Sequence, residues 1–151
     1  MARKKTPLPV EKAHLSTFML ADHAEAANGK LYVTGGSWNA MSTKDLPYVH
    51  PHLSVAATIE VPWTQTNEMH SLNVELLDED GTAVLPQRLE GQLEVGRAPG
   101  MRPGDYALVV LVFHLNNLKF DKAGAYSFVM KFDDEKIGTA KFRVLRVSQS
   151  A

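Results

Sequence analysis

The chain has 151 residues, of which 44% are hydrophobic and 22% charged, so we expect one globular domain with a sizeable core. Its 16 basic and 17 acidic residues nearly cancel, which gives no strong signal for nucleic-acid binding, because that binding needs a basic surplus or a basic stripe. The absence of cysteine excludes disulfides, thiolate catalysis and cysteine zinc sites, and it suits a reducing compartment.

Residues 1–13 are expected to form a flexible basic extension, and residues 14–148 a single domain. The basic run at 3–5 favours a solvated terminus, and contact with a phosphate or an acidic partner is the alternative. The extension lacks the apolar core and the cleavage site of a signal peptide. The longest apolar run, residues 107–113, is far shorter than the ~20 residues of a membrane span. We therefore expect a cytoplasmic protein without a membrane partner.

The first part of the domain carries the signals of a β-hairpin. Residues 21–27 are alanine-rich and short, which indicates an irregular strand or a single turn. The Asn-Gly pair at 28–29 predicts a tight hairpin turn, because both residues tolerate a positive φ. The glycine pair at 35–36 lacks the lysine of a phosphate-binding loop and predicts a bulge beside Trp38.

An alternation of apolar and polar side chains with period two predicts most of the remaining strands. The clearest example is residues 53–61, where every second residue from Leu53 to Val61 is apolar. Residues 96–104 hold three glycines and two prolines and are expected to form a loop. No segment shows apolar residues at convincing helical spacing. The other alternating segments are residues 71–76, 89–95, 126–132 and 140–144.

A short pattern at the start of one strand favours a sandwich. Asp121, Gly124 and Tyr126 read D-x-x-G-x-Y. In immunoglobulin-like sandwiches, a tyrosine at this corner bonds back to the backbone upstream. Phe128 takes the place where a true immunoglobulin domain has a cysteine. The sequence therefore predicts an all-β fold, an antiparallel, immunoglobulin-like β-sandwich of about eight strands.

The segment 107–115 is apolar on both faces and is interrupted only by a histidine. A strand of an open sandwich needs one apolar face, so something covers the second. One explanation is a central strand that a loop or the N-terminal segment covers. The other is an interface, for which Val109, Leu111 and Phe113 are the candidate residues.

Three stretches together resemble a bacterial family of unknown function, common in actinobacteria, of small all-β proteins. They are residues 29–38 (G-K-L-Y-x-x-G-G-x-W), residues 61–70 (V-P-W-x-x-x-N-x-x-H) and the turn around 76–81. The resemblance extends roughly from Leu15 to Val147 and implies the fold class. It implies no activity, cofactor or functional residue.

Six histidines raise the question of a metal site. His50 and His52 are separated by one residue, so an extended backbone would place both rings on one side. A zinc site needs at least one more ligand, which would have to be His70, His114 or Asp22. We expect loop histidines, with no metal and no other cofactor.

Catalytic motifs are not found in the sequence. There is no G-x-S-x-G nucleophile motif. Asp22 and His23 could form an acid–base pair, but neighbouring residues of a strand point to opposite faces. We therefore expect no catalytic residue and no enzyme activity.

Trp63 is the best candidate for an aromatic anchor, because Pro62 is expected to end its strand and leave it at the rim of the sandwich. The simpler interpretation is that Trp63 closes one end of the core. Arg97 and Arg102 are interface candidates in a second loop, which would lie near Trp63 only if the topology permits.

These observations favour a non-enzymatic protein-interaction or scaffold module that self-associates or joins a larger assembly. One alternative is a structural or decoration component of a virion or compartment shell, which rests on analogy of fold. Another is a small-molecule or metal-binding protein, or a hydrolase, that uses His50, His52 and Trp63. Metal analysis of untagged protein distinguishes this last class from the others.

Overall fold

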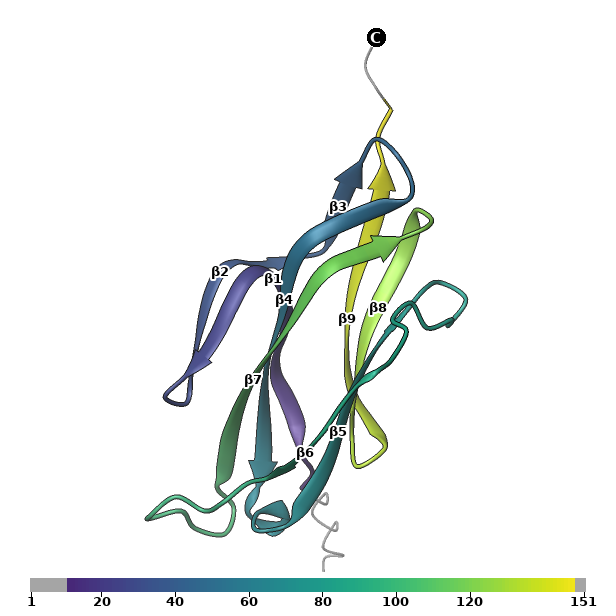
Figure 1. Cartoon of the computed structure of the whole chain (residues 1–151). Coiled ribbons are helices and arrows are strands. Elements are labelled where there is room, and N and C mark those ends of the chain that lie inside the picture. Colours follow the sequence, from purple (N-terminus) through teal and green to yellow (C-terminus); the bar gives the residue numbers. More distant parts are fainter. Residues whose placement is uncertain (1–10, 149–151) are drawn as a thin grey trace, which may run out of the picture.

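The alternating segments assemble into two sheets that pack face to face in the computed structural model, which describes residues 11–148 (Figure 1). Sheet A has the strand order β2-β1-β4-β7, and sheet B has the order β3-β9-β8-β5-β6. The strands are β1 (His14–Ala27), β2 (Lys30–Trp38), β3 (Ala40–Thr43), β4 (Tyr48–Pro62), β5 (Met69–Leu77), β6 (Leu89–Glu94), β7 (Tyr106–Phe120), β8 (Gly124–Phe132) and β9 (Glu135–Arg146).

The all-β sandwich is confirmed, but the strand number is not, and the prediction of wholly antiparallel sheets was wrong. The described residues form nine strands rather than about eight, and β3 pairs with β9 in parallel, so sheet B is not wholly antiparallel. A single-turn 3-10 helix, η1 (Trp63–Gln65), follows β4. No helix within residues 11–148 is long and apolar enough to cross a membrane.

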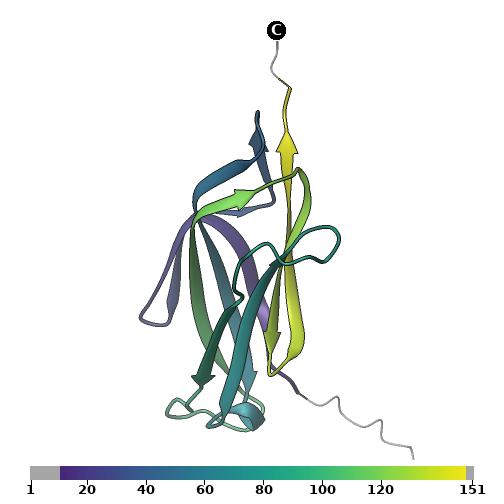
Figure 2. The same ribbon diagram turned by 45° about the vertical axis from the view of Figure 1, so that its right-hand side comes forward.

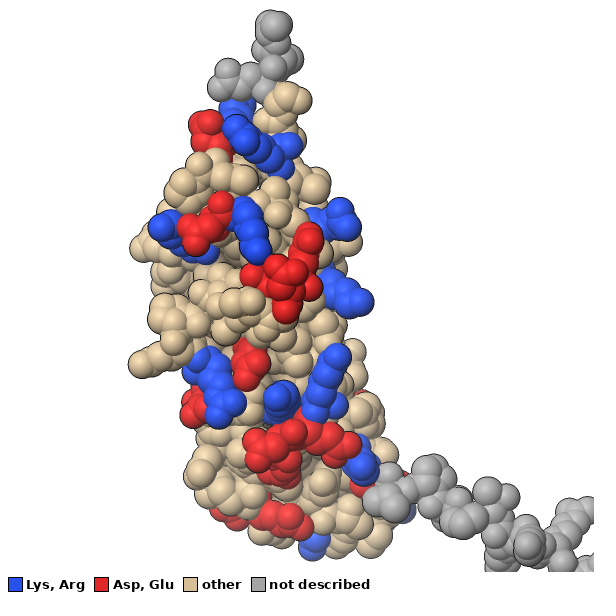
Figure 3. Space-filling view, turned by 90° about the vertical axis from the view of Figure 1, so that its right-hand side faces the viewer, with Lys and Arg blue, Asp and Glu red and all other residues tan. Residues whose placement is uncertain are grey.

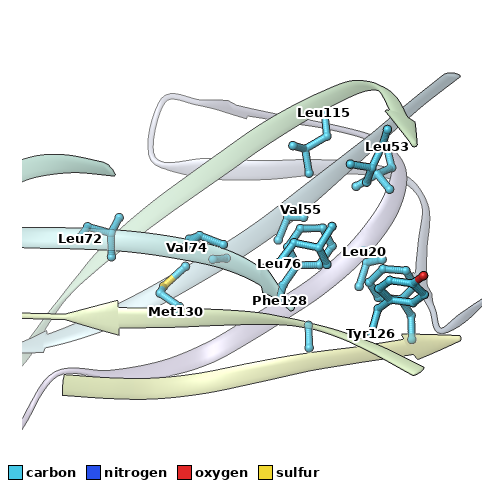
Figure 4. Close-up of a cluster of buried hydrophobic side chains, with 14 of the residues drawn as sticks. Leu20, Leu53, Val55, Leu72, Val74, Leu76, Leu115, Tyr126, Phe128 and Met130 are labelled. Atoms are coloured by element: carbon cyan, nitrogen blue, oxygen red, sulfur yellow. The ribbon is translucent and has the colours of Figure 1, made fainter. Parts of the chain in front are cut away.

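The core lies between the two sheets, and the period-two alternation explains it (Figure 4). From sheet A, β4 points every second side chain inward, and Leu53, Val55 and Ile59 are fully buried. From sheet B, Phe128 and Met130 of β8 are fully buried in the same way. Burial of such side chains stabilises the fold by about 1.5–3 kcal/mol each.

The tyrosine corner is present as predicted. The Tyr126 hydroxyl donates a hydrogen bond of 2.5 Å to the carbonyl of Lys122. Burial raises the pKa of the Tyr126 phenol above its ordinary value. The corner is therefore confirmed, whereas nine strands do not confirm the expected eight-stranded immunoglobulin-like arrangement.

Strand β1 changes partners along its length, and this change shapes the outer face of sheet A. It pairs with β4 only as far as Ala21 and continues with β2 alone to Ala27. The turn at 28–29 has positive φ at both residues, as predicted, and the bulge beside Trp38 is also present. Residues 21–37 thus form a two-stranded hairpin, which we call the β1–β2 hairpin; it lies beside β7 in both views (Figures 1 and 2).

The hairpin explains the doubly apolar segment of β7. Val109, Leu111 and Phe113 pack against the main core, so these interface candidates belong to the inner face of sheet A. Val112, on the outer face, packs against the hairpin's buried alanines. Leu108, near the start of β7, is 63% exposed. The second apolar face is therefore covered in part by the chain's own hairpin, and β7 is an edge strand rather than a central one.

The side of the molecule formed by sheet B carries charges of both signs (Figure 3). Acidic and basic side chains are interspersed there, and Lys122 lies 3.5 Å from a carboxylate oxygen of both Asp78 and Asp80. The basic run at residues 3–5 lies outside the described residues.

Candidate metal centre

Three histidines from neighbouring strands converge on the outer face of sheet A. They are His23 of β1, His52 of β4 and His114 of β7. One ring nitrogen from each lies within 4.8 Å of the other two. The Nδ1 atom of His23 is 3.1 Å from the Nε2 atom of His52. Imidazole nitrogens are preferred ligands of zinc, copper and nickel, so the cluster is a candidate metal centre.

Strand register explains how these rings meet. On β4, the alternation that buries Leu53 and Val55 turns His52 and Ser54 to the outer face. Ser54 is paired with His114 of β7, so His114 lies diagonally across from His52. On the other side of β4, the last pair of the β1–β4 ladder is Ala21 with Ser54. His23 follows two residues later, at the base of the β1–β2 hairpin.

Each ring is also held by a second hydrogen-bonding partner. The Nδ1 atom of His52 lies 2.7 Å from Oδ1 of Asn116. The Nδ1 atom of His114 lies 2.9 Å from Oγ of Ser54, and Nε2 of His23 lies 3.3 Å from a carboxylate oxygen of Glu25. Such outer partners orient the rings of metal-bound histidines and fix their tautomers.

The hydrogen-bond partners define which nitrogens face the centre. If Nδ1–H of His52 donates to Asn116, the lone pair of its Nε2 points at His23. The His23 ring then lies between two acceptors, this Nε2 and the Glu25 carboxylate. A metal ion between the two rings would bind the Nε2 lone pair of His52, which also lies 3.4 Å from the Ser54 hydroxyl. The 3.1 Å separation is close to the edge of a tetrahedron with zinc–nitrogen bonds of 2.0–2.1 Å, which is about 3.3 Å.

The residues predicted to hold a metal are only partly those in the cluster. His50 is not among the three; its Nδ1 lies 2.7 Å from the Tyr48 hydroxyl, and partial burial lowers its pKa. Asp22 contacts Gly35 on the neighbouring strand. Of the predicted metal ligands, His52 and His114 are therefore brought together, and His23 is the ligand that the sequence did not indicate.

Trp63 does not join His50 and His52. It lies in η1, beyond the far end of β4, about 36 Å of extended chain from His52. The guanidinium of Arg97 covers its ring at 3.5 Å from the centroid, and Nε of Arg97 donates to the Thr66 hydroxyl at 2.7 Å. The loop that contains Arg97 does contact Trp63, but the Arg97 guanidinium itself covers the face of the Trp63 ring.

Arg102, the other loop candidate, is placed differently. Its backbone N–H donates to the Asp105 carboxylate at 2.8 Å, and its side chain is 83% exposed. It therefore remains exposed at the surface and takes no part in the Arg97–Trp63 contact.

His70 has a structural environment instead of a metal-binding one. It is buried, with Nδ1 at 2.6 Å from the Asp133 carboxylate and Nε2 at 2.6 Å from the Gln65 carbonyl. Burial alone lowers the pKa of His70, but hydrogen bonds to Gln65 and Asp133 outweigh it and raise that pKa. Both ring nitrogens face acceptors, which favours the protonated ring, and the two contacts join η1 to the turn between β8 and β9.

The chain matches a model of a family of unknown function (DUF6941) over residues 16–145, which confirms the expected resemblance to a family of this kind. Its actinobacterial distribution stays a prediction. Comparison with curated proteins gave no match.

Among solved structures, the Pseudomonas fluorescens alkylpurine DNA glycosylase AlkC, bound to DNA containing an abasic site analog, is similar with 9% identity and a TM-score of 0.49. The alignment covers 89% of this chain and 30% of that one. A Listeria innocua β-glucosidase in complex with glucose has 12% identity and a TM-score of 0.44, over 91% of this chain and 16% of that one. This chain spans less than a third of either protein, and similarities this remote say nothing about its activity.

Proposed function

The chain belongs to the DUF6941 family, whose function is unknown, and we propose that it is a non-enzymatic β-sandwich that binds one divalent transition-metal ion. The ligands are His23, His52 and His114. The observation that supports this proposal is the convergence of three rings from three strands, each with an outer hydrogen-bonding partner. This set replaces the combination of His50, His52 and Trp63.

The three-histidine set favours zinc or a neighbouring metal. Neutral imidazole is a good ligand for Zn²⁺, whereas Mg²⁺ and Ca²⁺ prefer oxygen ligands. Three protein ligands leave one tetrahedral position open, which water fills. The side chain of His23 is 48% exposed, so solvent reaches one side of the cluster.

The Ser54 hydroxyl beside the three rings is inaccessible, so we propose no catalytic role for it. The Ser54 hydroxyl lies beside His114, as in a serine–histidine pair, yet Ser54 is fully buried. A substrate has no path to that oxygen, so the hydroxyl serves to orient the His114 ring.

The test is a zinc titration of the full chain without a histidine tag, in competition with a chromophoric chelator. We expect one equivalent of zinc per chain, because the three nitrogens form one site. Chains that leave all the zinc with the chelator, even at protein concentrations well above that of the chelator, would overturn the proposal.

A second candidate function, self-association, is favoured by the outer edge of sheet A. Strand β2 ends this sheet, and its side chains Tyr32 and Val33 are 56% and 39% exposed. An exposed edge strand offers unpaired backbone groups to another strand. We propose a second copy of the chain as the partner; attachment to a larger assembly or shell would use the same edge.

Light scattering over a concentration series tests this second proposal. We expect a mass of twice 16.7 kDa at high concentration, and a monomer for the variant Val33→Lys, because a charge at the edge opposes strand pairing. A native protein that stays monomeric throughout, or a variant that dimerises equally well, would contradict self-association through β2.

A further inference from the structure

We infer that the bound metal acts as a latch that holds the β1–β2 hairpin closed over the outer face of sheet A. This inference rests on the proposed metal site and adds a regulatory consequence to it. The latch follows from the way the three ligands are divided between two parts of the fold.

The hairpin is weakly attached without the metal. Beyond Ala21 its two strands pair only with each other, and an isolated two-stranded hairpin is marginally stable in water. Its packed contact with the sandwich is built on small side chains, since Ala21, Ala24 and Ala56 form the buried centre of that contact. Leu31 and Val112 pack around them. Alanines bury little apolar area, so they add little to the attachment.

The ligands connect the hairpin to the sheet. His52 and His114 belong to β4 and β7, which are paired along their whole length. His23 belongs to the hairpin, past the last residue that pairs with β4. A metal bound by all three rings therefore ties the hairpin to sheet A, and opening the hairpin breaks the bond to His23. Without a metal, the ring of His23 is held only by its hydrogen bonds and by stacking on His114 at 5.3 Å.

Opening would uncover an apolar surface. Ala56 is fully buried beneath the hairpin, and Val112 packs against the same alanines. Near the hairpin tip, residues 26–29 border a groove with residues 93–96 and 108–110, where Leu108 is already exposed. The metal-free protein thus presents a larger apolar area on β4 and β7 than the metal-bound protein.

Hydrogen exchange measured by mass spectrometry on the full chain tests the latch. We expect zinc to slow exchange of the amides in residues 22–37 about tenfold at free zinc ten times its dissociation constant, because only the closed hairpin binds the metal with three ligands. Amides of the exposed loop at residues 97–104, which carries no ligand, serve as the internal reference and should not change. The variant His23→Ala should lose the slowing, whereas His14→Ala, an exposed histidine on the same strand, should keep it.

Bound zinc is measured in the same samples, so the two proposals fail separately. Zinc that binds with native affinity while hairpin exchange stays unchanged would overturn the latch and leave the metal site standing. Equal slowing in His23→Ala would also overturn the latch. If no zinc is bound, the metal site itself fails, and the latch fails with it.

Discussion

Replacing His52 by alanine is expected to weaken zinc binding more than about 100-fold, because His52 is one of only three proposed ligands. Its Nε2 is 3.1 Å from the ring of His23, and its Nδ1 is held by Asn116. Loss of an outer partner alone typically weakens metal binding 10- to 100-fold, so loss of a ligand should exceed that range. The measurement is competition against a chelator of known zinc affinity, on protein whose circular dichroism confirms the fold.

The variant His50→Ala is the matched control. His50 lies two residues away on the same strand, but its ring bonds to Tyr48 and is not part of the cluster. We expect its zinc affinity to stay within about threefold of the native value. Equal losses in the two variants would favour the His50–His52 pair suggested by sequence spacing and would argue against the cluster.

The second large effect concerns stability: Asp133→Ala is expected to lower the free energy of unfolding by about 3 kcal/mol. The substitution removes the acceptor of the buried His70 ring and the acceptor of the Ser71 backbone N–H. Hydrogen bonds to charged groups contribute about 1.5–3 kcal/mol, and solvent around Asp133, which is 45% exposed, reduces this contribution. The remainder comes from placing alanine at a positive φ. Urea denaturation measures the change.

Asp134→Ala separates these two contributions. Asp134 occupies the same turn with φ of +64°, close to the +51° of Asp133, so both variants share the backbone penalty. We expect Asp134→Ala to lose only about 1 kcal/mol. If the two variants lose the same amount, the contact between His70 and Asp133 does not stabilise the fold.

The pH dependence gives an independent readout of this contact. The pKa of His70 is raised in the folded protein. Its contribution to the free energy of unfolding is therefore complete below the pKa of the unfolded state and is lost as pH rises through the pKa of the folded state. Burial alone would raise the pKa of Asp133, but its hydrogen bonds to His70 and Ser71 lower it, so its contribution is lost as pH falls through that lowered value. The native protein should therefore be more stable between these two pKa values than outside them, and Asp133→Ala should flatten the profile.

The fold was largely predictable because the side-chain period of a strand is visible in the sequence. The buried faces of β4 and β8 are the ones that the alternation predicted. The tyrosine corner is present at Tyr126, as the D-x-x-G-x-Y pattern predicted. Strand β3 was missed because four residues are too short to show a period, and its parallel pairing with β9 depends on a contact distant in sequence.

The sequence predicted only part of the three-histidine cluster, because pairing between distant strands brings its members together. His52 and His114 could be named as possible ligands, but their meeting depends on the register between β4 and β7, which alternation alone does not determine. His23 was interpreted only as the neighbour of Asp22. Its place in the cluster depends on β1 leaving β4 after Ala21, where a bulge interrupts the pairing of β1 with β2. The bulge was expected from the glycine pair at 35–36, but its consequence for His23 was not.

The most direct test of the metal centre is anomalous diffraction at the zinc absorption edge, from crystals of the untagged full chain grown with zinc. The proposed site predicts one peak per chain, about 2.0–2.1 Å from one ring nitrogen each of His23, His52 and His114. A peak bound by His50 or His70 instead, or no peak in crystals that contain zinc, would contradict it.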